Sequence, residues 1–295
     1  MTLTATGPEP VTRAHPLAPR SLLSAAVGSY LPIVLAVAVV VLPLVWMVLS
    51  SFKTPTELLS RDLSSLLPGS LAPTNYVQAA RDVPFVRLFL NSALVTVVGA
   101  GLKVLLAIST AYALVFVRFP AKKLIFAGIL VTLMVPPQVS LLPNYILVTG
   151  LGGADTYWGI ILPGLGTGFG TFLLRQHFMT LPMSILEAAE IDGAGHWRRL
   201  TRIVVPISAP SIVTVALVSI VFEWNDYLWP LVIVSNPSMM TLPVGLTLLT
   251  NNENGIAAYG VLMAGSVAVI VPVLIVFAAL QRYVISGLTQ GAVKD

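Results

Sequence analysis

Six long apolar runs constrain this chain more than any other feature of its sequence. Each is long enough for a helix that crosses a hydrocarbon core of about 30 Å, which takes about 20 residues. Strands are disfavoured, because an open sheet edge leaves backbone groups unpaired in lipid and no run alternates as a membrane barrel requires. The runs are 30–49, 93–117, 124–148, 157–174, 207–234 and 259–280.

Composition agrees with a membrane protein. The 295 residues are 56% hydrophobic and 9% charged, whereas soluble domains carry about 25% charged residues. No cysteine is present, which excludes disulfide scaffolds, thiolate metal sites and cysteine nucleophiles. His15, His177 and His196 are too far apart in sequence to suggest a metal site. We therefore predict an all-α integral membrane protein.

The ends of the chain are expected to be tails. Residues 1–29 are rich in proline, and the apolar run that follows is too long, and lacks a suitable cleavage site, for a signal peptide. Residues 30–284 are expected to form one six-span domain, and residues 285–295 a C-terminal tail. Eleven of the 16 basic residues fall in the tails and in alternate loops that share one side of the predicted membrane topology. The positive-inside rule places both termini on the cytoplasmic side of the cell membrane.

The loop 181–206 holds a charged island between two apolar runs, and the same rule places it in the cytoplasm. Ser184 followed by Glu187 fits a capping box at a helix start. Gly193 is a suitable helix stop, because glycine adopts the left-handed conformation at little cost. A second short helix is expected at about 197–203, with Pro206 opening the next span. The loop is therefore predicted to fold into a compact, partner-binding knob; the alternative is an amphipathic helix on the membrane interface.

The spacing within this loop resembles a known family. Glu187-Ala188-Ala189, three residues, Gly193, nine residues, Ile203, one residue and Val205-Pro206 resemble the EAA loop of binding-protein-dependent ABC importer permeases. Val205 departs from the leucine usual there. Further motifs resemble the smaller membrane subunit of the maltose permease type. They are 51–55 (SFKTP), Asn75-Tyr76, Asn91-Ser92, 111–113 (AYA), 118–120 (RFP), Arg175-Gln176 and 224–230 (WNDYLWP).

The resemblance implies a type I ABC importer permease fold with six spans and a cytoplasmic coupling helix. It implies a second, homologous permease subunit, two cytoplasmic ATPases, an extracytoplasmic solute-binding protein and membrane lipid as partners, and no nucleic acid. ATP and magnesium belong to the ATPase, since this chain has no G-x-x-x-x-G-K-[ST] loop. The chain itself is expected to be no enzyme and to bind no cofactor or metal. The residues implied in ATPase coupling are Glu187, Ala188, Ala189, Asp192, Gly193 and Ala194.

Within that family the chain looks most similar to glycerol-3-phosphate (Ugp-type) importers. The similarity rests on 84–92, Lys103, 132–136, 171–178 and the closing Gln281-Arg282 and Gly287-Leu288. It implies glycerol-3-phosphate or a glycerophosphodiester such as glycerophosphocholine as the solute. The alternatives are a neutral mono- or disaccharide of the maltose or trehalose kind, and a stand-alone secondary transporter, although no internal repeat is visible.

Lys103 provides a physical argument for an anionic solute. It lies near the middle of the second predicted span, where a charge is costly unless it is paired or hydrated. An anionic phosphate would be attracted to it. The alternative is an internal ion pair with Glu223 or Asp226 in the fifth predicted span.

A polar and aromatic cluster near the outer end of the fifth predicted span is the second candidate for the pathway. Its carboxylates, amide and rings could hold a hydroxylated or choline-bearing solute. Alternatively, the aromatic residues anchor the span at the interface and the amide bridges helices. The cluster comprises Glu223, Trp224, Asn225, Asp226, Tyr227 and Trp229. In the third run, Pro136, Pro137 and Pro143 predict a kink.

Overall fold

The structure is a computed structural model that describes residues 22–166, 168–250 and 258–289. Every regular element among these residues is a helix. Residues 1–21 of the expected N-terminal tail and 290–295 of the C-terminal tail lie outside the described residues. The chain divides into two units, Met1–Trp46 and Met47–Asp295, each of which is described by itself.

The first unit consists of most of helix α1 (Leu22–Ser50). The helix begins inside the segment 1–29 that was expected to be a tail. Its apolar stretch Tyr30–Ser50 is long enough to cross a membrane. Between Tyr30 and Val45 the side chains point outward, as expected of a helix whose solvent is lipid.

A polar turn follows α1 and leads to α2 (Pro55–Leu59), η1 (Leu63–Leu66) and α3 (Thr74–Asp82). Asn75 holds this turn, since its amide donates to the carbonyl oxygens of Ser51 and Lys53, at 2.9 Å each. Lys53 is 1% exposed, and burial lowers the pKa of its ammonium group, against an opposing effect of the Glu57 carboxylate. Asn75 therefore serves the scaffold rather than the pathway.

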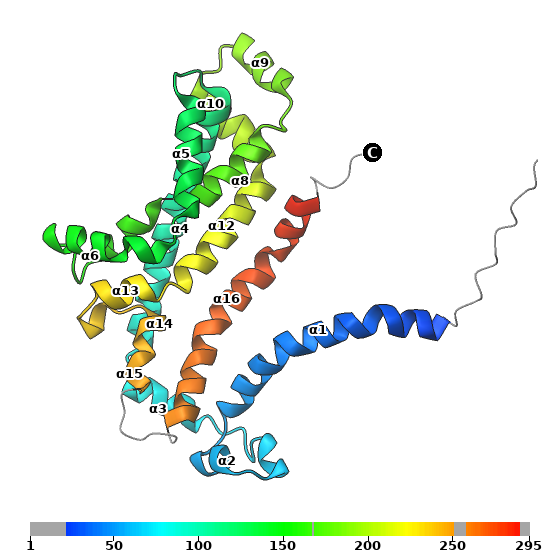
Figure 1. Cartoon of the computed structure of the whole chain (residues 1–295), viewed down its shortest axis with the longest axis vertical. Coiled ribbons are helices and arrows are strands. Elements are labelled where there is room, and N and C mark those ends of the chain that lie inside the picture. Colours follow the sequence, from blue (N-terminus) through cyan, green and yellow to red (C-terminus); the bar gives the residue numbers. More distant parts are fainter. Residues whose placement is uncertain (1–21, 167, 251–257, 290–295) are drawn as a thin grey trace, which may run out of the picture. The chain divides into compact units, whose positions relative to one another are not determined.

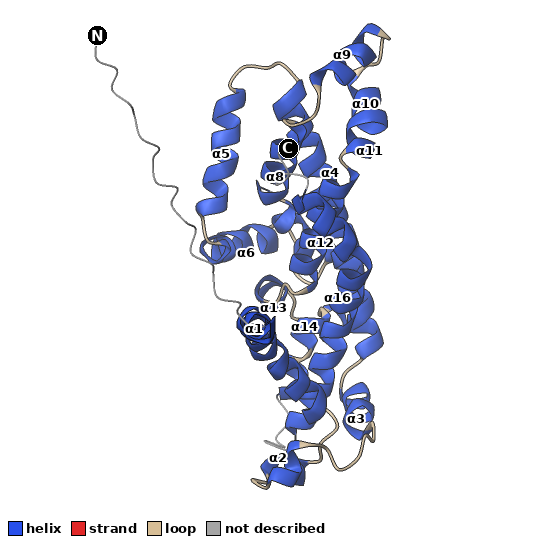
Figure 2. Ribbon diagram, turned by 90° about the vertical axis from the view of Figure 1, so that its right-hand side faces the viewer, coloured by secondary structure: helices blue, strands red, loops and turns tan. Residues whose placement is uncertain are grey.

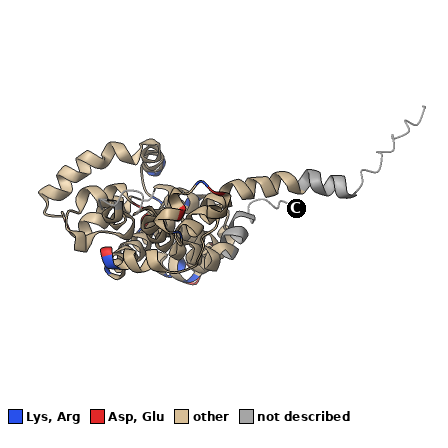
Figure 3. Cartoon of the chain, turned by 90° about the horizontal axis from the view of Figure 1, so that it is seen from below, with Lys and Arg blue, Asp and Glu red and all other residues tan. Residues whose placement is uncertain are grey.

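Four helices of the second unit run side by side and form its frame (Figures 1 and 2). They are α4 (Phe85–Phe116), α8 (Gly168–Phe178), α12 (Ala209–Trp224) and α16 (Ala258–Thr289). Buried residues of α4, α8 and α12 form one apolar cluster with the charged loop, and α4, α12 and α16 contribute to a second. Charged residues are sparse along the ribbon, as the composition predicted (Figure 3).

Three bent pairs of helices overlap the third, fourth and fifth predicted spans. The third run forms α5 (Lys122–Met134), η2 (Pro137–Ser140) and α6 (Leu141–Gly150). The bend between α5 and the helical stretch Pro137–Gly150 is 94°, at the prolines that predicted a kink. The pair Tyr157–Leu165 and Gly168–Phe178 bends by 46°, and the pair His196–Ile207 and Ala209–Trp224 by 83°. With three unbroken helices that are long and apolar enough to cross a membrane, these pairs give up to six spans among the described residues.

The fifth predicted run, 207–234, is not one helix. Helix α12 ends at Trp224, and a separate α13 (Leu228–Ile233) follows. The prediction of a continuous span was wrong here, because Asn225 and Asp226 compete for the backbone groups that a continuing helix would use. The chain then forms η5 (Pro237–Met239), α14 (Leu242–Gly245) and α15 (Thr247–Thr250).

Polar residues from the sequence motifs fasten the segment that follows α13 to the start of α4. The Asn91 amide donates to the carbonyl oxygens of Ser238 and Met240, at 3.0 and 2.9 Å. The Ser92 hydroxyl accepts the backbone N–H of Leu242 at 2.7 Å. Asn91 and Ser92 therefore stabilise the fold near the N-terminus of α4, which is far from the charged loop.

Candidate coupling surface and transport cavity

The charged loop folds into two short helices joined by a glycine elbow, at the top of Figure 1. Helix α9 (Met183–Ile191) is followed, after its C-cap Asp192, by Gly193, whose φ is +75°. The Gly193 N–H donates to the Glu190 carbonyl at 3.0 Å, and the Ala194 N–H to that of Ala189 at 2.9 Å. This pair of bonds is a Schellman motif, which requires a left-handed residue at the position of Gly193. The glycine stop predicted from the sequence is present.

The predicted capping box is absent. Helix α9 begins at Met183 with Pro182 as its N-cap, and no side chain caps its start. Ser184 therefore lies one residue inside the helix, because Pro182 has a suitable φ of −62° and starts the helix earlier than the hydroxyl pattern suggested.

The second helix of the knob is longer than predicted. It runs through α10 (His196–Arg199), the π-helical turn η4 (Leu200–Val204) and α11 (Val205–Ile207). Pro206 therefore lies within the helix, and the 83° bend falls at Ser208 before α12. The π turn accommodates the proline, because widened turns relax the hydrogen-bond pattern that proline disrupts.

A polar network ties the two knob helices to α4. The buried Arg199 guanidinium donates to the Glu190 carboxylate at 2.8 Å and lies 3.3 Å from His196 Nδ1. The same His196 nitrogen is 3.2 Å from the hydroxyl of Tyr112 on α4. Leu186 of α9 is also buried, in the apolar cluster that includes Tyr112. The knob is thus attached to the helix that carries Lys103.

The predicted coupling residues lie mainly on the outer surface of the knob. Ala189 and Ala194 are half-buried at the elbow. Two large apolar side chains beside them, Ile191 and Trp197, are 87% and 75% exposed. Sequence reasoning did not single these two out, although apolar residues inside a charged segment were a usable signal. The exposed coupling residues are Glu187, Ala188, Asp192 and Gly193.

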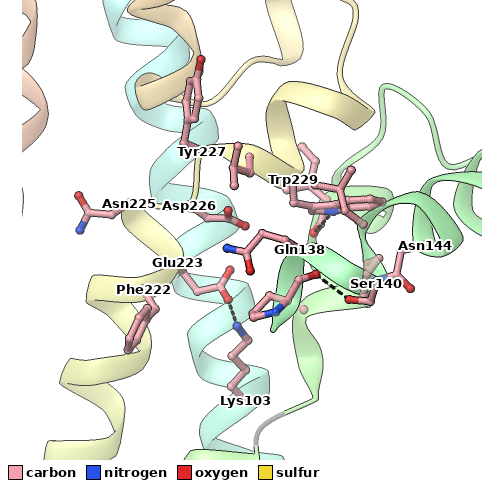
Figure 4. Close-up of a pocket in the computed structure, with 16 residues that line it drawn as sticks. Lys103, Gln138, Ser140, Asn144, Phe222, Glu223, Asn225, Asp226, Tyr227 and Trp229 are labelled. Atoms are coloured by element: carbon pink, nitrogen blue, oxygen red, sulfur yellow. Dashed lines mark hydrogen bonds and ion pairs between the residues drawn. The ribbon is translucent and has the colours of Figure 1, made fainter. Parts of the chain in front are cut away.

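A polar cavity of about 540 Å³ opens between α4, α6, α12 and α13. Figure 4 shows its side chains converging from segments that are far apart in the sequence. It contains most of the pathway residues predicted from the sequence. Its polar and aromatic lining comprises Lys103, Gln138, Ser140, Asn144, Phe222, Glu223, Asn225, Asp226, Tyr227 and Trp229.

Lys103 forms an ion pair with Glu223, whose side chain is 10% exposed (Figure 4). Of the two partners considered for Lys103, the structure selects Glu223. Gly99, one turn before Lys103, makes room for the pair: a Cβ atom there would lie 2.8 Å from a Glu223 carboxylate oxygen. Since Asp226 also lines the cavity, the formal charge of its three charged residues, Lys103, Glu223 and Asp226, is −1.

The remaining predicted residues separate into two groups. Asp226 and Trp229 lie in the cavity wall, where the Trp229 indole N–H is 3.1 Å from the carbonyl oxygens of Gly159 and Ile160. Asn225 and Tyr227 line its edge and point away from its centre (Figure 4). The Asn225 amide donates back to the Val221 carbonyl of α12 at 2.8 Å. Asn225 therefore caps its own helix.

Trp224 lies outside this cavity, contrary to its predicted place in the pathway. Its indole N–H donates to the Val269 carbonyl on α16 at 2.9 Å, and its ring packs against Phe89 with centroids 5.5 Å apart. Because α12 turns Trp224 toward α16 while Glu223 faces α4, two adjacent residues serve different functions. Trp224 is a packing residue.

Gln138, Ser140 and Asn144 are the polar cavity residues that sequence reasoning missed. They come from η2 and α6, just after the bend at Pro136. Three polar side chains in an otherwise apolar run, immediately after two prolines, were the available signal. They add two amides and a hydroxyl to the cavity.

Comparison with known proteins agrees with this architecture. The sequence pattern of the family described as binding-protein-dependent transport system inner membrane component matches residues 103–290. The sn-glycerol-3-phosphate transport system permease protein UgpE of Brucella abortus (strain 2308) is 32% identical over 268 residues, covering 88% of this chain and 95% of the relative. That of Agrobacterium fabrum is 33% identical over 273 residues, covering 90% and 96%.

A relative named for a different substrate is similar to the same degree. The arabinooligosaccharides transport system permease protein AraQ of Halalkalibacterium halodurans is 35% identical over 259 residues, covering 87% of this chain and 92% of the relative. Among solved structures, a bacterial ABC transporter involved in alginate import superposes with a TM-score of 0.79 at 23% identity, covering 92% of this chain and all of that one. That likeness shows the fold. This chain belongs to the family of binding-protein-dependent transport system inner membrane components.

Proposed function

We propose that this chain is one of two homologous permease subunits of an ATP-driven importer. Family membership supports this role, and the observation that carries it is the knob: an exposed glycine elbow flanked by coupling-motif residues and tied to α4. In this role the knob lies in the cytoplasm and docks on an ATPase, which holds ATP and magnesium. The polar cavity then lies along the solute path between the two permeases.

The surface of the knob supports an ATPase as its partner. Ile191 and Trp197 expose large apolar side chains on a segment that also carries exposed carboxylates. Exposed aromatic and aliphatic anchors beside polar groups are typical of protein interfaces. Small side chains at Ala188 and Gly193 allow a partner to approach the backbone.

The absence of cysteine from the sequence gives a direct test of this docking. A single Ile191→Cys variant should form a crosslink to a cysteine introduced in the docking groove of the ATPase. Val139→Cys, exposed near the distant bend, is the matched control and should not crosslink. Co-purification of an ATPase and a second permease with this chain is also required; a chain that transports alone in proteoliposomes would refute the proposal.

We propose glycerol-3-phosphate or a glycerophosphodiester such as glycerophosphocholine as the solute. Two UgpE relatives named for glycerol-3-phosphate, at 32% and 33% identity, support this choice. The cavity offers Lys103 as a cation for the phosphate, provided that its pair with Glu223 opens during transport. Asp226 and the Trp229 ring would then face the opposite, cationic end of a choline ester.

A neutral oligosaccharide is the second candidate. AraQ, 35% identical, is named for arabinooligosaccharides. With Lys103 paired, the cavity presents amides and a hydroxyl, which suit the hydroxyl groups of sugars. Uptake by the reconstituted complex with its binding protein separates the two candidates: competition by glycerol-3-phosphate or glycerophosphocholine supports the first, and competition by arabinooligosaccharides alone supports the second.

A further inference from the structure

A second charged cavity, separate from the polar cavity at Lys103, lies near the end of the four-helix frame that bears the knob. It has a volume of about 340 Å³ and lies between the end of α4, the start of α5 and the end of α8. Its basic residues are Lys122, Lys123 and Arg175. Its other walls are apolar and include Phe126 and Met179. Neither the proposed ATPase docking nor the proposed solute path uses this cavity.

Arg175 is held in place without a counter-ion. Its guanidinium carbon lies 3.9 Å from the centroid of the Phe126 ring, so the ring fixes the plane of the group. The Arg175 Nε atom is buried and has no hydrogen-bond partner among the described residues. A buried donor without a partner is costly, so this N–H is available to an acceptor that enters the cavity.

The two lysines add charge to the same cavity. Lys122 donates to the carbonyl oxygens of Val115 and Val117 at 3.0 and 3.1 Å, at the end of α4, which leaves one of its three N–H donors. Lys123 is exposed. Among the residues that the structure describes, none of the three cations has an acidic partner. The cavity therefore attracts an anion.

We propose that this cavity binds the phosphate headgroup of an anionic phospholipid. The cations belong to the start of α5 and the last turn of α8, beside the end of α4. Ends of membrane-spanning helices are where basic side chains meet lipid headgroups. The planar Arg175 guanidinium matches phosphate oxygens, and Lys123 and the free Lys122 donor reach the same region. The apolar wall at Phe126 and Met179 accommodates the start of an acyl chain. Basic pockets between spans are known to bind such headgroups.

Native mass spectrometry of the full chain tests this site, with phosphatidylglycerol or phosphatidylcholine added to the detergent-purified protein. Wild type should retain phosphatidylglycerol in preference to phosphatidylcholine. Arg175→Gln and Lys123→Gln should each weaken retention about fivefold, the effect of one basic residue near a membrane surface. Lys123 is exposed, so its variant remains informative if Arg175→Gln is unstable. Arg118→Gln removes the same charge from an exposed position outside the cavity and should retain the lipid.

Three results would overturn the proposal. Equal losses in Arg118→Gln and Lys123→Gln would mean diffuse attraction of the membrane to basic loops. Competition by millimolar inorganic phosphate as effective as that by phosphatidylglycerol would mean a soluble-anion site. Equal retention of the two lipids by wild type would mean that the cations face a protein carboxylate instead. None of these results depends on the identity of the solute or of the ATPase.

Discussion

The knob and the polar cavity are built in opposite ways. The knob comes from one continuous segment, and hydrogen bonds between close neighbours in sequence, such as Ala194 to Ala189, set its shape. The cavity brings together Lys103, Gln138 and Glu223 from three distant parts of the chain. A local motif can be read directly from residue spacing, whereas an assembled site becomes visible only once the spans are packed. The following variants test this contrast.

The largest effect is expected for Gly193→Val. A β-branched residue is strongly disfavoured at φ +75°, and left-handed backbone costs L-residues about 1–2 kcal/mol even without branching. Loss of the elbow should abolish uptake while membrane abundance, measured by immunoblot, is retained. Gly195→Val is the control, because Gly195 has a φ of −65° and open space around it. Equal loss in both variants would show that added bulk, rather than backbone conformation, limits coupling.

Lys103→Met should have the next largest effect. Removing one partner of a buried ion pair costs about 3–5 kcal/mol, because Glu223 is left without its counter-charge. The double variant Lys103→Met/Glu223→Gln should recover thermal stability and complex assembly. If Lys103 binds phosphate, uptake of glycerol-3-phosphate stays low in the double variant. Full recovery of that uptake would leave the pair a purely structural role.

Gly99→Ala tests the close approach on which the cavity depends. The added methyl group would lie 2.8 Å from a Glu223 carboxylate oxygen, so the carboxylate must move away from α4. Uptake should fall several-fold with a smaller change in melting temperature. Gly101→Ala, on the same helix with nothing within 4 Å, should match wild type. Wild-type uptake by the Gly99→Ala variant would show that the ion pair tolerates displacement of the Glu223 carboxylate.

The smallest effect is expected for Glu190→Gln in the knob. The Glu190 side chain is 67% exposed, and exposed pairs contribute only about 0.2–1 kcal/mol. The melting temperature should therefore change little. The ratio of solute transported to ATP hydrolysed should fall, because the contact of Arg199 that joins α10 to α9 loses its charge and is weakened. A large loss of stability with a normal ratio of transport to ATP hydrolysis would show that the Arg199–Glu190 pair serves folding only.

Sequence reasoning succeeded where a single segment carries the information. The positions of the apolar runs and the left-handed Gly193 follow from local chemistry. It failed at the end of α12, where a continuous span was predicted and Trp224 was placed in the pathway. Hydropathy does not register a break inside an apolar run, and it cannot tell which of two adjacent residues faces which neighbour. That Gln138 lines the cavity became visible only in the packed fold.

The order of Lys103 and Glu223 along the chain has a consequence for biogenesis. Ribosomes deliver α4 to the membrane long before α12 exists, so Lys103 reaches the bilayer without its counter-charge. An unpaired lysine at the centre of a helix opposes insertion by about 3 kcal/mol. That cost lasts until α12 brings the Glu223 carboxylate to Lys103. The ion pair thus links the stability of α4 in the membrane to the later arrival of α12.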